Sequence, residues 1–226
     1  MNFAGNFLHI GSVDIAALRD RVLALPEEQW EGETFRQQRY EVHRDTRTIS
    51  LVFDADFRHT HPTRLPALQM FEPYLRPILE LAAGHFDGSP AGQSLLEEYG
   101  MGYFVRANLV RMQAGGEITE HTDNNFSLVH SHRIHIAIMT NDDVWFSVGK
   151  ERINIPEGEI YEINNRRVHA VRNEGSTDRI HLIMDYVIPG EKCCCGQKLH
   201  PQTACNRDAC EATDHQKMAC ICYQEA

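Results

Sequence analysis

From Gly102 onward the chain alternates between short, largely hydrophobic segments and breaks rich in Gly, Asn, Asp and Pro. Within several segments hydrophobic and polar residues alternate, which is the pattern of a β-strand with two different faces. The predicted strands span residues 103–112, 132–139, 144–148, 152–155, 159–163, 168–171 and 179–187. So many short strands in one stretch predict an antiparallel sandwich or barrel of the jelly-roll type, with helices on the outside.

The N-terminal part of the chain shows helical spacing instead. A first helix is expected to begin after Ser12 or Asp14, either of which can cap it, and to end before Pro26. Residues 36–54 are rich in Tyr, Val, Thr and Ile, which indicates extended chain.

A second helix is predicted over about residues 66–84, where two prolines limit its regularity and Gly84 ends it. A short helix is predicted over residues 93–98. The fold class is therefore mainly β within α+β: a double-stranded β-helix (a jelly-roll or cupin-like barrel) with flanking N-terminal helices.

The cysteines divide the chain into two parts. All seven lie after residue 192, so the body cannot depend on disulfide bonds. We expect a jelly-roll domain with an N-terminal helical and extended support region over residues 1–188 and an irregular Cys/His-rich tail over residues 189–226.

Charge and hydropathy exclude some classes of function. The formal net charge of −10 disfavours nucleic-acid binding, which needs clustered lysine and arginine. No apolar run approaches the roughly 20 residues that span a bilayer, and the first residues lack the pattern of a signal peptide. A cytoplasmic protein without a membrane partner is expected.

Two of the predicted strands carry a hydrophobic face and a face with an arginine and a histidine. Successive residues of a strand point to opposite sides, so Arg133 and His135 oppose the isoleucines between and after them. Arg179 and His181 are placed in the same way on the last strand. If the hydrophobic faces pack under helices, the arginines point into the barrel, where a buried charge needs an anionic partner, either from the protein or from a carboxylate ligand.

Three residues have the pattern of a metal site. His121 and Asp123 project to the same side of extended chain, and His169 begins another predicted strand. Two histidines and one carboxylate on one face of a metal leave three positions open, as in non-haem Fe(II) oxygenases. Arg179 follows His169 by ten residues, which places it on the next strand of the same barrel.

The segments that carry these residues resemble the aspartyl/asparaginyl β-hydroxylase family of iron- and 2-oxoglutarate-dependent oxygenases. They are RANLVRMQAGGEITEHTD, HRIHIAI and PEGEIYEINNRRVHAVRNEGSTDRIHLIMDYV, and the resemblance covers residues 100 to 188 closely. It implies that His121, Asp123 and His169 bind the iron.

The same resemblance implies the cosubstrate site. Arg179 would bind a carboxylate of 2-oxoglutarate, and Arg133 and His135 would support the cosubstrate. The family often has a small hydroxylic residue near position 110, where this chain has Val110.

The resemblance implies an Fe(II)- and 2-oxoglutarate-dependent dioxygenase that uses O₂ to hydroxylate an aliphatic carbon of an amino acid or of an amino-acid residue in a peptide. Succinate and CO₂ would be the other products. One rival is a zinc-dependent hydrolase with the same three ligands, which gives the two interior arginines no obvious role. Another is a non-catalytic sensor that binds iron or 2-oxoglutarate and acts through the tail.

Further polar residues share the inner faces of the strands. Arg106 and Asn108 are candidates for substrate binding, although Arg106 could equally form a salt bridge at the barrel rim. His181 is expected to be a cavity-wall histidine bonded to a neighbour. His130 and His132 are expected to have no catalytic role.

The tail has a second, weaker pattern of metal-binding residue types. They recur at intervals of five residues, which fits neither a helix nor a strand: Cys195, His200, Cys205, Cys210, His215 and Cys220. A structural zinc site, a disulfide or redox function, and a loose thiol-rich tail all stay open, because no C-x-x-C pair is present.

Overall fold

The computed structural model describes residues 5–34, 38, 41–55, 62–123 and 126–191. The candidate ligands of the Cys/His-rich tail lie outside these residues. Among the described residues, no helix combines the length and the apolar character needed to cross a bilayer.

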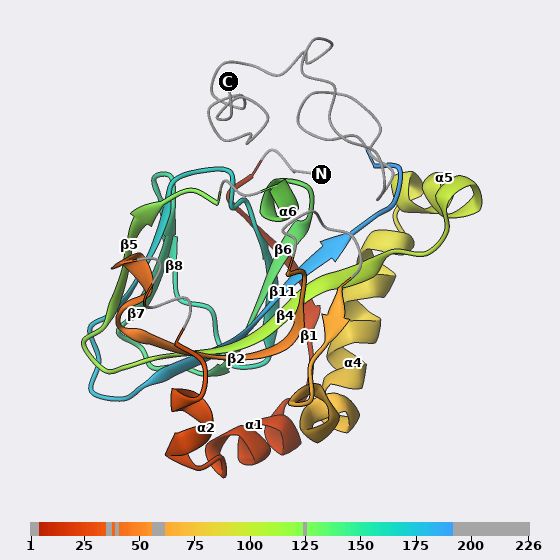
Figure 1. The fold of residues 1–226 in the computed structure, drawn as a ribbon. Coiled ribbons are helices and arrows are strands. Elements are labelled where there is room, and N and C mark those ends of the chain that lie inside the picture. The colour runs from red at the N-terminus through yellow and green to blue at the C-terminus, as the bar shows by residue number, and fades with distance from the viewer. Residues whose placement is uncertain (1–4, 35–37, 39–40, 56–61, 124–125, 192–226) are drawn as a thin grey trace.

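Two antiparallel sheets form the body of the protein (Figure 1). The larger sheet has the strand order β1-β9-β6-β11-β4-β2-β3, and the smaller sheet has the order β5-β10-β7-β8. The strands of the larger sheet are β1 (Phe7–Ser12), β2 (Thr46–Phe53), β3 (Thr63–Arg64), β4 (Tyr103–Met112), β6 (His132–Met139), β9 (Glu159–Ile163) and β11 (Arg179–Val187). Those of the smaller sheet are β5 (Glu117–His121), β7 (Val144–Val148), β8 (Glu151–Ile153) and β10 (His169–Asn173). The expected jelly-roll fold is confirmed.

The helices lie mostly outside the larger sheet, with α4 running along it, whereas α6 lies near the upper end of β6 (Figure 1). They are α1 (Ala16–Leu23), α2 (Glu27–Glu31), α4 (Leu68–Asp87), α5 (Pro90–Tyr99) and α6 (Phe126–Val129), and Glu41–His43 forms the short 3₁₀-helix η1. One hydrophobic core contains residues of α4, three isoleucines of β6, and a leucine and a methionine of β11. The residues of the two strands are Ile134, Ile136, Ile138, Leu182 and Met184. The alternation predicted from the sequence therefore turns the arginine and histidine faces of these strands toward the barrel interior.

The helix α4 continues past the predicted end at Gly84. The amide N–H of Gly88 donates to the carbonyl oxygen of Gly84 over 3.0 Å, so the glycine lies within the last turn rather than after it. Pro73 and Pro77 both lie on the exposed side of the helix, where water can reach the carbonyl groups that proline leaves without an N–H partner. The helix α5 is also longer than predicted, and Ser89 caps it by accepting from the N–H of Gly92.

Two parts of the strand prediction were wrong or incomplete. Extended chain was expected throughout residues 36–54, but η1 interrupts it and β2 begins only at Thr46. The strands β1 and β5 were not predicted at all. Both are short, and each pairs with a single neighbour, β9 for β1 and β10 for β5, so long-range pairing rather than local pattern defines them.

A buried histidine joins the end of the barrel to the segment that follows β11. The two ring nitrogens of His132 lie 2.6 Å from a Glu162 carboxylate oxygen and 2.9 Å from a Glu191 carboxylate oxygen. Burial alone would lower the pKa of His132, but the two carboxylates, Glu191 foremost, raise the pKa to about 9. The histidine is therefore doubly protonated at neutral pH and acts as a structural cation.

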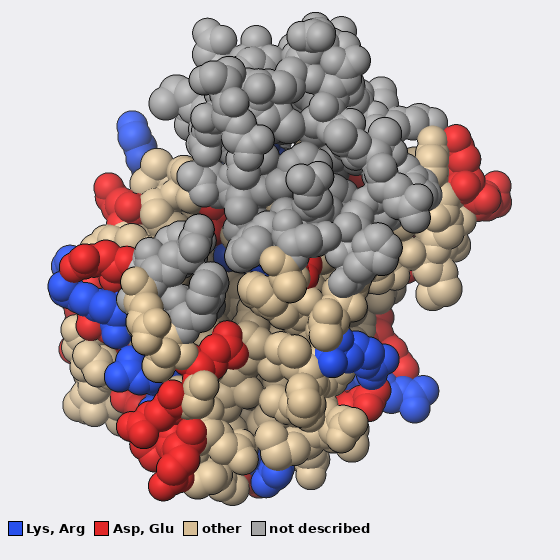
Figure 2. Space-filling view, in the orientation of Figure 1, with Lys and Arg blue, Asp and Glu red and all other residues tan. Residues whose placement is uncertain are grey.

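Charged side chains of both signs are mixed over the described surface in the view of Figure 2, where Lys and Arg lie among Asp and Glu. No extended basic patch is visible on the described part of this face.

We expect Ile136→Ala to lower the free energy of unfolding by about 2–5 kcal/mol, because it leaves a cavity between the sheet and α4. Denaturant unfolding measures the change. Met101→Ala, at a side chain that is 74% exposed, should change the same free energy by less than about 0.5 kcal/mol. Similar losses in both variants would contradict the assignment of the core.

The His132 cation also predicts a pH dependence of stability. Its folded pKa lies above the ordinary value of 6.5, so its stabilising contribution is complete below about pH 6.5 and is lost as the pH rises through about 9. Urea unfolding of the wild type should therefore show a falling free energy over this window, and His132→Gln should remove that part of the slope. Parallel pH profiles for the two proteins would exclude the contribution.

Candidate metal centre

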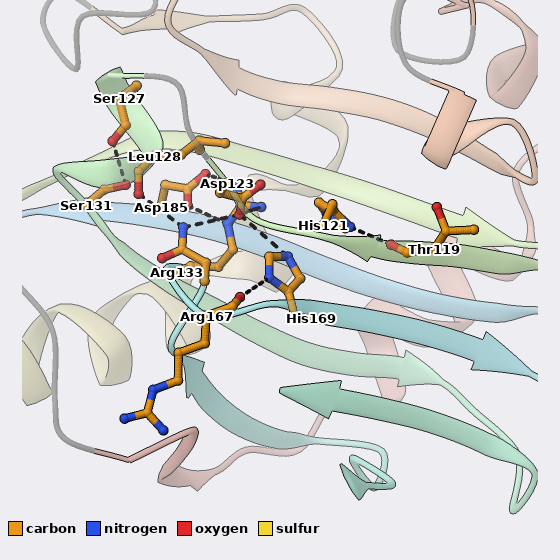
Figure 3. Close-up of polar contacts among 11 residues, drawn as sticks. Thr119, His121, Asp123, Ser127, Leu128, Ser131, Arg133, Arg167, His169 and Asp185 are labelled. Carbon is orange, nitrogen blue, oxygen red and sulfur yellow. Dashed lines mark hydrogen bonds and ion pairs between the residues drawn. The ribbon is translucent and has the colours of Figure 1, made fainter. Parts of the chain in front are cut away.

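The register of β5 and β10 brings three residues with metal-binding side chains together. His121, at the end of β5, lies directly opposite His169, at the start of β10, and their ring centroids are 4.3 Å apart. Asp123 follows two residues after His121. One potential ligand atom from each of the three side chains lies within 4.8 Å of the others, and Figure 3 shows the side chains converging at the barrel mouth.

The two histidines are oriented in the same way. The Nδ1 of His121 lies 2.7 Å from the carbonyl oxygen of Thr119, and that of His169 lies 2.9 Å from the carbonyl oxygen of Arg167 (Figure 3). A carbonyl oxygen only accepts, so each Nδ1 donates and each Nε2 keeps its lone pair for a metal. Burial lowers the pKa of His169, which favours the neutral, ligating form of the ring.

Asp123 is buried and held by two side chains. The Nη1 of Arg133 lies 2.8 Å from Oδ2 of Asp123, and the amide nitrogen of Asn165 donates to the same oxygen over 3.2 Å. Burial opposes ionisation, but the positive charge of Arg133, followed by His169 and His121, holds the pKa of Asp123 well below its usual range. The site therefore presents a fixed carboxylate beside two imidazole rings.

Arg133 is bound by protein carboxylates on two sides. Besides its contact with Asp123, its Nε and Nη2 each donate over 2.9 Å to the two oxygens of Asp185, which is fully buried on β11. The sequence predicted that Arg133 supports a cosubstrate. In the structure, its guanidinium holds the candidate metal ligand Asp123 and spans the neighbouring strands β6 and β11.

Arg179 has the opposite environment. It is 1% exposed, and none of its three guanidinium nitrogens has a hydrogen-bond partner within the part of the chain that the structure describes. Burial lowers its pKa to about 9, so the group is still a cation at neutral pH. A buried cation without a counter-ion is costly, and such a site favours an anionic ligand.

His135 and His181 connect Arg179 to the metal centre. Burial lowers the pKa of His135 well below its ordinary value, and His181 and then Arg179 are the next causes of the shift. The ring centroid of His135 lies 5.8 Å from that of His181, and the rings of His135 and His169 both lie near Phe146. Both ring nitrogens of His181 and Nδ1 of His135 lack partners among the described residues. The bond to a neighbour that was expected for His181 is thus not found there.

The two candidate substrate residues lie on the inner face of β4. Arg106 forms a very short ion pair with the buried carboxylate of Asp54, which corresponds to the salt-bridge interpretation that the sequence left open. The Oδ1 of Asn108 is buried and has no partner among the residues that the structure describes.

Three residues around the site were not singled out from the sequence. Asn165 and Asp185 orient the centre, and Thr48 on β2 contributes a buried hydroxyl to the same interior. For Asp185 a signal existed, because the alternation of β11 puts it on the face of Arg179. Thr48 and Asn165 are brought to the site by pairings between segments distant in sequence.

Comparisons with known proteins agree with the fold. The sequence model of the aspartyl/asparaginyl β-hydroxylase family matches residues 86–189. A comparison with curated protein sequences finds no match. An oxidoreductase of the 2OG-Fe(II) oxygenase family from Burkholderia pseudomallei is similar in fold, with 16% identity, 69% of this chain and 70% of that chain covered, and a TM-score of 0.50.

Two further solved structures are more distant. The viral collagen prolyl hydroxylase of Paramecium Bursaria Chlorella virus-1 shares 10% identity over 81% of this chain and 96% of its own, with a TM-score of 0.45. A prolyl hydroxylase from Trichoplax adhaerens shares 11% over 82% and 84%, with a TM-score of 0.46. The family match rests on the sequence: residues 86–189, which carry all three residues of the candidate metal centre, match the model of the aspartyl/asparaginyl β-hydroxylase family of oxygenases.

Proposed function

We propose that the protein is an Fe(II)- and 2-oxoglutarate-dependent dioxygenase that hydroxylates an aliphatic carbon of an amino acid, either free or within a peptide. The observation that carries the proposal is the buried guanidinium of Arg179, which lacks a protein partner among the described residues and shares one interior with the His121, Asp123 and His169 cluster. A buried cation and a three-ligand metal site inside one barrel suit a cosubstrate that has both a metal-chelating end and a distant carboxylate.

The donor set fits ferrous iron. Two imidazoles and one carboxylate leave three coordination positions for the cosubstrate and O₂. When bound, the iron and 2-oxoglutarate would supply the oxidising chemistry, with succinate and CO₂ as products beside the hydroxylated substrate.

The surrounding residues hold the ligands in place. Arg133 and Asn165 keep Asp123 ionised and fixed, and the carbonyl groups of Thr119 and Arg167 fix the two histidine rings. Loss of such a supporting contact typically lowers metal affinity by about 10- to 100-fold.

Arg179 would bind the far carboxylate of 2-oxoglutarate. Two parallel N–H···O bonds from a guanidinium match a carboxylate in both charge and geometry. The carboxylate would also serve as the counter-ion of Arg179. Burial of the Arg179 charge destabilises the protein without cosubstrate, and binding of the carboxylate would relieve this cost and thereby strengthen cosubstrate binding. His135, kept neutral by burial, would form the wall between this carboxylate and the metal.

The substrate would lie beyond the metal, toward β4. Asp54 neutralises the charge of Arg106. The electrostatic attraction of Arg106 for a substrate carboxylate would therefore be weaker than that of an arginine without an acidic partner. Asn108 keeps a buried amide oxygen that an N–H group of the substrate could satisfy. An amino acid or a peptide both offer such N–H groups.

The rival functions are less well supported. A zinc-dependent hydrolase would use the same three ligands but would leave Arg179 without an anion. A non-catalytic sensor would bind the same ligands as the proposed enzyme, and it differs only in forming no product.

Anaerobic titration tests the cosubstrate site. Adding Fe(II) and then 2-oxoglutarate should produce the weak visible charge-transfer band of the chelated complex. We expect His169→Ala to abolish the band, and Arg179→Ala to raise the Kd for 2-oxoglutarate by about 30-fold or more, because a buried charge pair loses one partner. Absence of the band in the wild type, combined with tight zinc uptake, would refute the proposal.

A second titration tests the support of Asp123. Asn165→Ala should weaken Fe(II) binding by about 10-fold, because the carboxylate loses a bond that orients it while the charge of the site stays the same. Asn154→Ala is the matched control: its side-chain amide likewise donates two hydrogen bonds, but to the backbone carbonyl groups of Asn141 and Val144 and to none of the three candidate ligands. Equal Fe(II) affinities in the two variants would show that Asn165 has no part in metal binding.

A further inference from the structure

Val110 stands on the inner face of β4 where the family resemblance leads one to expect a small hydroxylic side chain. It is 1% exposed and cannot form a hydrogen bond. Its two cross-strand neighbours are both polar: the register pairs Val110 with Thr48 of β2 on one side and with His181 of β11 on the other. Directly opposed residues share a face of the sheet, with Cβ atoms about 4.5–5.5 Å apart.

Both neighbours carry buried polar atoms without partners. The hydroxyl of Thr48 and the two ring nitrogens of His181 form no hydrogen bond with any residue that the structure describes, and the two residues are 0% and 1% exposed. A buried polar group left unpaired costs about 1–3 kcal/mol, so such groups ordinarily find a partner or serve a ligand.

Thr46 shows that β2 does satisfy a buried hydroxyl where a partner is within reach. It is two residues from Thr48 on the same strand and the same face, and its hydroxyl donates to the carbonyl oxygen of His43 over 2.7 Å. The unsatisfied hydroxyl of Thr48 is therefore a property of its position rather than of the strand.

His181 and Arg179 are close neighbours on β11, and Thr48 projects from the same face of the sheet. Arg179 precedes His181 by two residues, so both side chains leave β11 on the same face. After burial, the charge of Arg179 is the second cause that lowers the pKa of His181, as expected for close neighbours. Arg179, His181 and Thr48 thus line one corner of the barrel, and Val110 lies between the last two.

We propose that Thr48 and His181 bind the distal carboxylate of 2-oxoglutarate together with Arg179, in place of the hydroxyl that Val110 lacks. This inference rests on the proposed function. The two carboxylate oxygens accept about four hydrogen bonds. Arg179 donates two of them, the Thr48 hydroxyl donates a third, and one N–H of the neutral His181 ring donates the fourth.

Such an arrangement would give selectivity for a dicarboxylic 2-oxo acid. A monocarboxylic 2-oxo acid of similar length would leave the donors of Arg179, Thr48 and His181 unpaired, and a site built from buried donors strongly rejects a ligand that cannot accept from them.

The decisive variant is Thr48→Val, which keeps the shape of the side chain and removes only the hydroxyl. We expect the Kd for 2-oxoglutarate on the anaerobic Fe(II) protein, read from the charge-transfer band, to rise about tenfold. Adding Val110→Ser to this variant should restore most of the affinity, because it returns a hydroxyl to the adjacent position. Thr46→Val, whose hydroxyl already has a protein partner, should leave the Kd within about twofold.

Two readouts separate binding from a structural role. The apoprotein of Thr48→Val should be as stable as the wild type or more stable in urea, because the variant removes an unpaired buried hydroxyl. Binding of 2-oxopentanoate, which lacks the distal carboxylate, should be the same in wild type and Thr48→Val. If Thr48→Val does not fold, Thr48→Ala takes its place in each measurement.

The outcomes distinguish this inference from the function on which it rests. A wild type that binds no 2-oxoglutarate refutes the proposed function. A wild type that binds it with dependence on Arg179, while Thr48→Val and His181→Leu bind equally well, refutes the role of Thr48 and His181 alone. Weaker binding of 2-oxopentanoate by Thr48→Val would also overturn the inference, because the hydroxyl would then act elsewhere on the ligand.

Discussion

The strict alternation of side chains along β6 and β11 is the constraint on which the rest of the structure depends. One face of each strand carries isoleucine, leucine and methionine into the core under α4, and the other carries arginine and histidine into the barrel. A slip of one residue would exchange the two faces, and the charges of Arg133 and Arg179 would then enter the hydrophobic layer. The stability gained on the helix side therefore fixes the register that builds the site.

The two interior arginines illustrate how differently a buried charge can be accommodated. Arg133 is compensated within the protein, because Asp185 and Asp123 neutralise it and it orients Asp123 in return. Arg179 has no such partner among the described residues. The proposed function depends on this difference, because a carboxylate ligand would be drawn to Arg179 rather than to Arg133, which protein carboxylates already neutralise.

Features set by local pattern could be predicted from the sequence, and features set by long-range pairing could not. The strands with one hydrophobic and one polar face could be predicted because their pattern repeats every two residues. The candidate ligands His121, Asp123 and His169 could be predicted because their spacing matches a family motif. The strands β1 and β5 depend on partners far along the chain, and α4 passes Gly84 because its hydrophobic face continues to Phe86. The pairing of Arg133 with Asp185 needs the β6 to β11 register, which alternation alone does not give.

The same reasoning explains how a binding group could move between strands without a change of fold. In an antiparallel sheet, residues on adjacent strands in one register row project side by side into the same interior. The row that contains Val110 also contains Thr48 and His181, so three backbone positions, distant in sequence, face nearly the same volume. A ligand interacts with the donors that reach it and not with the strand that carries them. Such barrels are therefore best compared by sets of residues that lie opposite one another on adjacent strands. Where a motif position lacks its usual side chain, an equivalent group should be sought first at the paired positions of the two neighbouring strands.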